Sequence, residues 1–149
     1  LADVMTARIG IEPYAARLLA DHGTKKAHQE LRRLVDAVPA AREAGTVAQA
    51  SAALHRRLVE LSGNDTLAML AGMLHEISER HTTAAILRDE AVLPGPAYTK
   101  LIRSYGRLAS LVTDRKGAEA EGHWRRHMEN ASAALLKGYE KTQVRDILY

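Results

Sequence analysis

Hydrophobic residues recur at intervals of three and four along most of the chain, which is the spacing that lines one face of an α-helix. Runs of alternating or β-branched residues, which would indicate strands, are missing from the sequence. Together with capping and turn residues, this pattern predicts helices over residues 2–22, 24–37, 47–62, 66–87, 97–113 and 118–141. The sequence therefore predicts an all-α protein.

Turn-forming residues mark the breaks between these segments. Thr46 is expected to cap the third helix, and Ser62-Gly63-Asn64-Asp65 predicts a tight two-helix hairpin. We interpret residues 38–45 as a break or a short extra turn, and residues 91–96, with two prolines and a glycine, as a loop. Pro13 is expected to kink the first helix.

Composition supports a single helical domain over residues 1–149. The chain is 46% hydrophobic and long enough to bury a proper core. It has no phenylalanine and only 4% aromatic residues, so aliphatic and alanine side chains must fill the interior, which suits closely packed helices. Because the chain starts at Leu1 rather than at a methionine, we expect it to be part of a longer protein.

Composition also narrows the classes of function. Without cysteine, the chain can form neither disulfides nor thiolate metal sites. The net charge of +3 is small and the basic residues are interspersed with acidic ones, which gives little support for nucleic-acid contact by this segment. The sequence contains neither a signal segment nor a long apolar span, so we expect a cytoplasmic protein that does not enter membranes.

Two opposite charges lie inside the apolar stripe of the first predicted helix. Arg8 and Glu12 are four residues apart on that stripe, where an ordinary surface pair would lie on the opposite face. One interpretation is an intrahelical ion pair whose aliphatic stems pack on the core. The other is that Arg8 faces a cavity that holds an anionic ligand.

Other polar residues that periodicity buries lie on three further helices. His55 lies beside an apolar stripe and shares a face with Ser51, four residues earlier, while Tyr105 and His127 lie in the middle of their stripes. Each histidine alone is explained by a hydrogen bond in the core. If the helices converge, however, Arg8, His55, Tyr105 and His127 would line a polar pocket inside a bundle.

The remaining histidines carry less information. His123 and His127 are four residues apart on one helix face, which is a weak metal signal in any helix. His75 and His81 lie on the broad apolar helix over 66–87, and we interpret them as structural or surface histidines. That helix carries apolar residues on a second side as well, which suggests burial between neighbours or at a subunit interface.

Three motifs carry a family resemblance that covers nearly the whole chain. They are Arg8-Ile9-Gly10-Ile11-Glu12 with the alanine-rich run over 15–20, Leu54-His55 with Ser62-Gly63-Asn64, and Trp124-Arg125-Arg126-His127-Met128. In this order and at these separations, they resemble the motifs of the FCD domain. That domain is the C-terminal, effector-binding part of the FadR-type branch of the GntR transcription regulators.

The resemblance implies the architecture and the partners. It implies an antiparallel bundle of about six or seven helices that encloses an internal effector pocket and forms a homodimer. It also implies an N-terminal winged helix-turn-helix, absent from this chain, through which alone the protein would bind operator DNA. The expected effector is a small organic acid or an acyl-thioester, whose binding would change operator occupancy.

The resemblance also implies a metal position. Many family members bind a divalent metal, such as zinc or nickel, through an aspartate, a histidine four residues later and two further histidines. His55 and His127 match two of these positions, but Ser51 and Tyr105 occupy the other two. A serine hydroxyl and a protonated phenol are poor zinc ligands. We therefore favour a pocket in which His55, Tyr105 and His127 donate hydrogen bonds to the effector and Arg8 supplies charge.

Two alternatives to a regulator domain remain. The first is a metal-dependent helical-bundle enzyme that uses His55, His123 and His127. Against it, the sequence has no Glu-x-x-His pair positioned for a di-metal bundle, no His-Glu-x-x-His motif, no phosphate loop and no nucleophile elbow. The second is a dimerisation module with a vestigial pocket, in which His127→Leu would stabilise the fold without affecting function.

Overall fold

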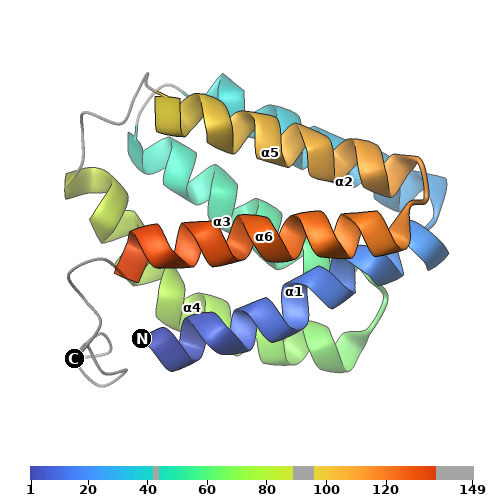
Figure 1. Cartoon of the computed structure of the whole chain (residues 1–149), viewed down its shortest axis with the longest axis horizontal. Coiled ribbons are helices and arrows are strands. Elements are labelled where there is room, and N and C mark those ends of the chain that lie inside the picture. The colour runs from blue at the N-terminus through green and yellow to red at the C-terminus, as the bar shows by residue number, and fades with distance from the viewer. Residues whose placement is uncertain (42–43, 89–95, 137–149) are drawn as a thin grey trace.

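A computed structural model describes residues 1–41, 44–88 and 96–136, which form six helices and no strand (Figure 1). The helices are α1 (Ala2–His22), α2 (Lys25–Ala40), α3 (Ala44–Leu61), α4 (Asp65–Arg88), α5 (Pro96–Thr113) and α6 (Gly117–Leu136). The prediction of an all-α bundle of about six or seven helices is confirmed. None of the described helices is both long and apolar enough to cross a membrane.

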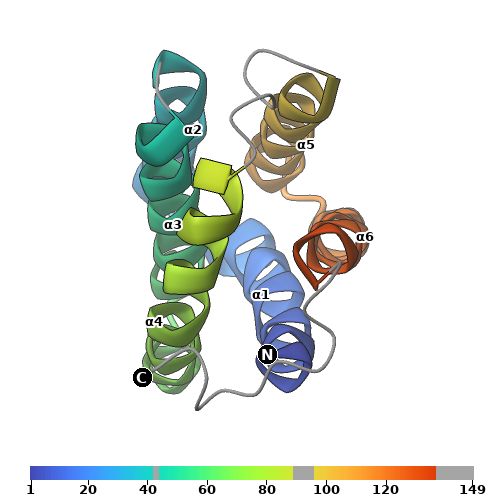
Figure 2. The same cartoon turned by 90° about the vertical axis from the view of Figure 1, so that its left-hand side faces the viewer.

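The central helix is α1, which packs against all the others. Figure 2 shows it in the middle of the bundle, with α2, α3 and α4 on one side and α5 and α6 on the other. Its fully buried residues include Ala15, Ala16 and Ala20, whose small side chains let neighbouring helices approach closely. α1 runs through Pro13 as one helix, and the predicted kink there stays a prediction.

The main core lies between α1, α2, α3, α5 and α6 and is mostly aliphatic, as the lack of phenylalanine requires. Its largest fully buried side chains are Trp124, Tyr105, Leu19, Leu31, Leu54, Leu58, Leu108 and Leu111. A separate small cluster of Ala15, Val59 and Ala71 joins α4 to α1 and α3. Among the described side chains, α4 therefore joins the bundle through this small cluster rather than through the main core.

Two predicted helix boundaries are wrong. Of the segment 38–45, expected to form a break or a short extra turn, residues 38–40 belong to α2, which continues to Ala40. Val38 is fully buried and lies in phase with Leu31 and Val35, so core packing extends the helix, and Pro39 removes a backbone donor only in the last turn. Thr46 does not cap α3, which already begins at Ala44; alanine is a strong helix former and favours this extra half-turn.

The other boundaries agree with the predictions within the described ranges. Gly63 follows α3 with a positive φ of 80°, and the Asn64 side chain accepts a hydrogen bond of 2.9 Å from the Leu67 N–H group at the start of α4. Pro96 opens α5, where its missing N–H group is not needed. Residues 91–95 and the predicted helical segment beyond Leu136 lie outside the described residues.

Candidate functional site

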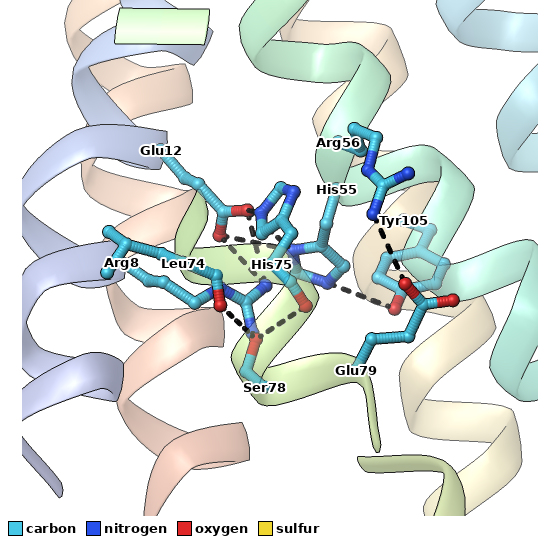
Figure 3. Close-up of polar contacts among 9 residues, drawn as sticks. All are labelled: Arg8, Glu12, His55, Arg56, Leu74, His75, Ser78, Glu79 and Tyr105. Atoms are coloured by element: carbon cyan, nitrogen blue, oxygen red, sulfur yellow. Dashed lines mark hydrogen bonds and ion pairs between the residues drawn. The ribbon is translucent and has the colours of Figure 1, made fainter. Parts of the chain in front are cut away.

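A buried polar cluster is centred on Glu12 in the middle of α1 (Figure 3). Its other members are Arg8 from α1, His55 from α3, His75 from α4 and Tyr105 from α5. We call these five residues the Glu12 cluster. Figure 3 shows their side chains pointing toward one another across the interior. The cluster therefore links four of the six described helices.

The Glu12 carboxylate accepts hydrogen bonds from three side chains. Arg8 Nη2 lies 3.2 Å and His75 Nε2 lies 2.6 Å from its Oε1, and His55 Nδ1 lies 3.1 Å from its Oε2. Glu12 itself is fully buried. A buried carboxylate is tolerated only when it is paired and hydrogen-bonded, and these three donors meet both conditions.

The hydrogen-bond partners assign the protonation states of the cluster. Nδ1–H of His55 donates to Glu12, so its Nε2 is the acceptor for the Tyr105 hydroxyl at 3.4 Å. Nε2–H of His75 donates to Glu12, which leaves the Nδ1 atom of His75 as an acceptor. Arg8 and Glu12 form the ion pair of the cluster, and both imidazoles donate to the same carboxylate.

The surroundings shift the pKa values of three cluster members. Burial opposes the charge on Glu12, but attraction to His55 and Arg8 and hydrogen bonds from His55 and His75 keep the pKa of Glu12 well below its usual value. Burial also lowers the pKa of His55, against the attraction of Glu12. Burial raises the pKa of Tyr105 to about 12. The phenol is therefore neutral and acts as a donor at pH 7.

Of the two interpretations of Arg8, the structure shows the first, an ion pair with Glu12 inside the bundle. Besides Glu12, its Nη1 donates to Ser78 Oγ at 3.1 Å, and Ser78 in turn donates to the Leu74 carbonyl at 3.0 Å. Arg8 is only 7% exposed, and its Nε–H group has no hydrogen-bond partner among the described residues. Because Glu12 already compensates the charge of Arg8, the group of Arg8 that remains available to a ligand is the Nε–H donor.

The expected convergence of helices is present at His55. The His55 ring lies 6.1 Å from the Tyr105 ring, 6.0 Å from the His127 ring and 5.1 Å from the Trp124 ring, measured between centroids. His127 stacks on Trp124 at 4.4 Å and accepts or donates a 2.8 Å hydrogen bond between its Nδ1 and Ser104 Oγ. Arg8, His55, Tyr105 and His127, from four different helices, therefore surround one region of the bundle.

His75 is the residue that the sequence analysis missed as a site member. Of the two interpretations, structural or surface histidine, the structure supports the structural one, because His75 is buried. It also makes the shortest hydrogen bond to Glu12. The signal was its phase with Ala71 and Ser78, which are also buried on α4. Trp124 was placed on an apolar stripe but not in the site, although its ring lies among His55, Tyr105 and His127. The side chain of His81 lies outside the described residues.

Four buried polar atoms near this region form no hydrogen bond of acceptable geometry within the described part of the chain. They are Arg8 Nε, Ser51 Oγ, His75 Nδ1 and Trp124 Nε1. Leaving such a group unpaired costs about 1–3 kcal/mol each. The two N–H groups can donate, the imidazole nitrogen can accept, and the serine hydroxyl can do both. Together they offer a ligand a mixed set of polar contacts.

The four positions that the family pattern assigns to a metal do not fit one in this chain. Both ring nitrogens of His55 already have partners, Tyr105 is a neutral phenol and Ser51 supplies no carboxylate. No group of three or more histidine, aspartate or glutamate side chains in the described ranges is arranged to hold a metal ion. The chemistry that remains available here is hydrogen bonding rather than metal coordination.

One surface groove lies away from the Glu12 cluster. It has a volume of about 360 Å³ and runs beside α2 and α3, where it is lined by residues that include Leu34, Ala52 and Arg57. None of the predicted effector residues lines it. The internal effector pocket itself stays a prediction, supported by the unpaired polar atoms described above.

Comparison with known proteins identifies one family. The family model described as the FCD domain matches residues 3–130, which is most of the chain. No curated protein and no solved structure matches the chain. The matched range includes the Glu12 cluster together with Ser51, Trp124 and His127.

Proposed function

Because this chain belongs to the FCD domain family, the C-terminal effector domain of GntR/FadR-type regulators, we propose that it senses a small organic acid inside the bundle. In this proposal, effector binding changes how an attached winged helix-turn-helix occupies operator DNA in the cytoplasm, and the protein acts as a homodimer. The FCD domain is a regulatory, non-enzymatic module. The metal-dependent enzyme alternative is therefore not carried further.

The observation that carries the choice of ligand is the set of unpaired buried polar atoms. A carboxylate offers acceptors to the N–H groups of Arg8 Nε and Trp124 Nε1. A hydroxyl on the same acid would meet His75 Nδ1 as an acceptor and Ser51 Oγ as a second partner. A small hydroxylated acid would satisfy donors and acceptors together, whereas a hydrocarbon ligand would leave all four unpaired.

The Glu12 cluster supplies the link to conformational change. Its side-chain hydrogen bonds connect α1 directly to α3 and α4, and to α5 through His55. A ligand carboxylate that accepts from Arg8 Nε brings a second negative charge close to the Glu12 carboxylate, and the repulsion between them favours one arrangement of these helices over another. Only such differential affinity can move an attached domain, and a coupling of about 1–3 kcal/mol is typical.

A thermal-shift screen of the chain tests this proposal. The ligands are hydroxylated and plain carboxylic acids, acyl-thioesters, and zinc or nickel, each with and without chelator. An acid present at about 100 times its Kd should stabilise the fold by about 2.7 kcal/mol, whether or not chelator is present. If only acyl-thioesters or only metals stabilise the chain, the proposed ligand class is wrong.

Two conservative variants locate the binding. Trp124→Phe keeps an aromatic ring but removes the Nε1–H donor, and Ser51→Ala removes one hydroxyl. Both should reduce the stabilisation by the acid, whereas Tyr14→Phe, at an exposed position on α1, should not. A vestigial pocket predicts instead that no ligand shifts the wild-type midpoint and that His127→Leu raises it.

A further inference from the structure

The outer side of α4 exposes apolar side chains that the bundle does not cover. Met69 is 62%, Leu70 42% and Met73 63% exposed, and among the described residues only Tyr14 on α1 is another large apolar side chain in this class. Figure 2 shows α4 at the edge of the bundle, and it packs against α3 and α1 through its opposite side. Clustered exposure of this kind marks interaction surfaces.

Five exposed residues and the half-buried Gly72 form a continuous stripe at helical spacing. We call it the outer face of α4, and its members are Asp65, Met69, Gly72, Met73, Glu76 and Arg80. A Cβ atom built at Gly72 would meet nothing within 4 Å, so the backbone there is open on this side. A glycine with open space at its Cβ position, between two exposed methionines, lets another helix approach closely and lets a methionine of that helix fill the space.

The outer face of α4 carries one acidic and one basic residue that would pair with the same residues of a second, antiparallel copy. Asp65 lies at the first residue of α4 and Arg80 lies 15 positions later, and neither forms an ion pair within the described part of the chain. The two are about 22 Å apart along the helix. The midpoint between them falls between Gly72 and Met73. An antiparallel copy of α4 centred there would pair Asp65 with the partner's Arg80 at both ends.

We propose that the outer face of α4 is the dimer contact of this chain, packed antiparallel against α4 of a second copy. In this arrangement Met73 of each copy lies against the partner's Gly72, and two equivalent Asp65–Arg80 pairs flank the apolar centre. This inference rests on the proposed function in one respect: the proposed function assumes a homodimer, and the inference says where its two copies meet. It does not depend on which effector binds.

Sedimentation equilibrium of the 149-residue chain tests the contact. We expect a monomer–dimer equilibrium whose Kd rises about tenfold or more in Met73→Glu, because two like charges then meet at the apolar centre. Ala133→Glu, which adds the same charge at an exposed position on α6, should leave the Kd unchanged. A dimer that Met73→Glu leaves intact, or a wild-type chain that stays monomeric, overturns the proposal.

A charge exchange and a cross-link test the register. Asp65→Arg and Arg80→Asp should each weaken the dimer, and the double variant should restore it. Since the chain has no cysteine, Met73→Cys introduces a single thiol that should form a disulfide-linked dimer on oxidation, whereas Ala133→Cys should not. Absence of both restoration and cross-linking contradicts the antiparallel register.

The variant Gly72→Leu distinguishes failure of the dimer proposal from failure of the effector proposal. Gly72→Leu should strengthen the helix, because glycine is a poor helix former, while it blocks close approach of the second copy. A stably folded, monomeric Gly72→Leu chain that still responds to an organic acid supports the α4 contact and the proposed function. Loss of the acid response with the dimer intact would contradict the effector proposal alone.

Discussion

At the scale of single residues, the interior is organised by one carboxylate. Glu12 accepts from Arg8, His55 and His75, and every one of these partners is itself largely buried. The sequence could predict Arg8 and Glu12 as an unusual pair, because both break an apolar stripe. It could not predict that His75 would complete the pair, because the meeting of α1 and α4 depends on tertiary packing rather than on local spacing.

Replacing Glu12 by glutamine should be strongly destabilising. The change leaves the buried Arg8 charge without its counterion and replaces one acceptor oxygen by an amide N–H donor that faces other donors, so the free energy of unfolding should fall by about 3–5 kcal/mol. Urea denaturation measures the loss. Glu79→Gln, which removes a solvent-exposed pair with Arg56, should cost about 0–1 kcal/mol. Equal losses in the two variants would show that the Glu12 cluster does not stabilise the bundle.

His127 gives the fold a defined dependence on pH. Burial lowers its pKa from 6.5 to about 3 in the folded chain. The unfolded chain therefore binds a proton that the folded chain does not bind between about pH 6.5 and 3. The stability contributed by neutral His127 is present above pH 6.5 and is lost progressively as the pH falls through this window.

The variant His127→Gln should flatten this pH dependence. It keeps a polar partner for Ser104 but cannot take up the proton, so the slope of unfolding free energy against pH should fall by up to about 1.4 kcal/mol per pH unit. Chemical denaturation at a series of pH values gives the slope. His22→Gln, at an exposed position at the end of α1, is the matched control. An unchanged slope in His127→Gln would mean that His127 titrates normally.

At the scale of helices, periodicity predicted which segments fold and missed the end of α2 and the start of α3. The six helices follow from apolar spacing, and the α3–α4 hairpin follows from Gly63 and Asn64. The end of α2 does not follow, because the burial of Val38 in the core outweighs the local effect of Pro39. Local signals are therefore reliable where the chain turns in solvent and weaker where a helix end is buried.

The cap of α4 is a helix-scale test of this reasoning. Asn64→Ala removes the acceptor of the Leu67 N–H group and should lower the free energy of unfolding by about 0.5–2 kcal/mol. Asn130→Ala, at an exposed position inside α6, is the control and should be neutral or slightly stabilising, since alanine is the better helix former. If the order of the two variants is reversed, Asn64 is not the effective cap.

At the scale of the whole molecule, the convergence of helices turns scattered polar residues into one region. Periodicity placed Arg8, His55, Tyr105 and His127 on inner faces, but only the packing of the other helices around α1 brings them together. The resemblance of three sequence motifs to the FCD domain implied that convergence, which spacing alone could not show. The unpaired atoms on Arg8, Ser51, His75 and Trp124 could not be predicted, because they depend on side-chain geometry.

The central claim is that an organic acid binds in this region and accepts a hydrogen bond from Trp124. Because the chain has a single tryptophan, its indole N–H group gives a single nuclear magnetic resonance signal. The measurement is a titration of that signal with the acid that most stabilises the chain in the thermal-shift screen. We predict a saturable downfield shift with the same Kd as the thermal stabilisation. Stabilisation with an unmoved indole signal would contradict binding at this site.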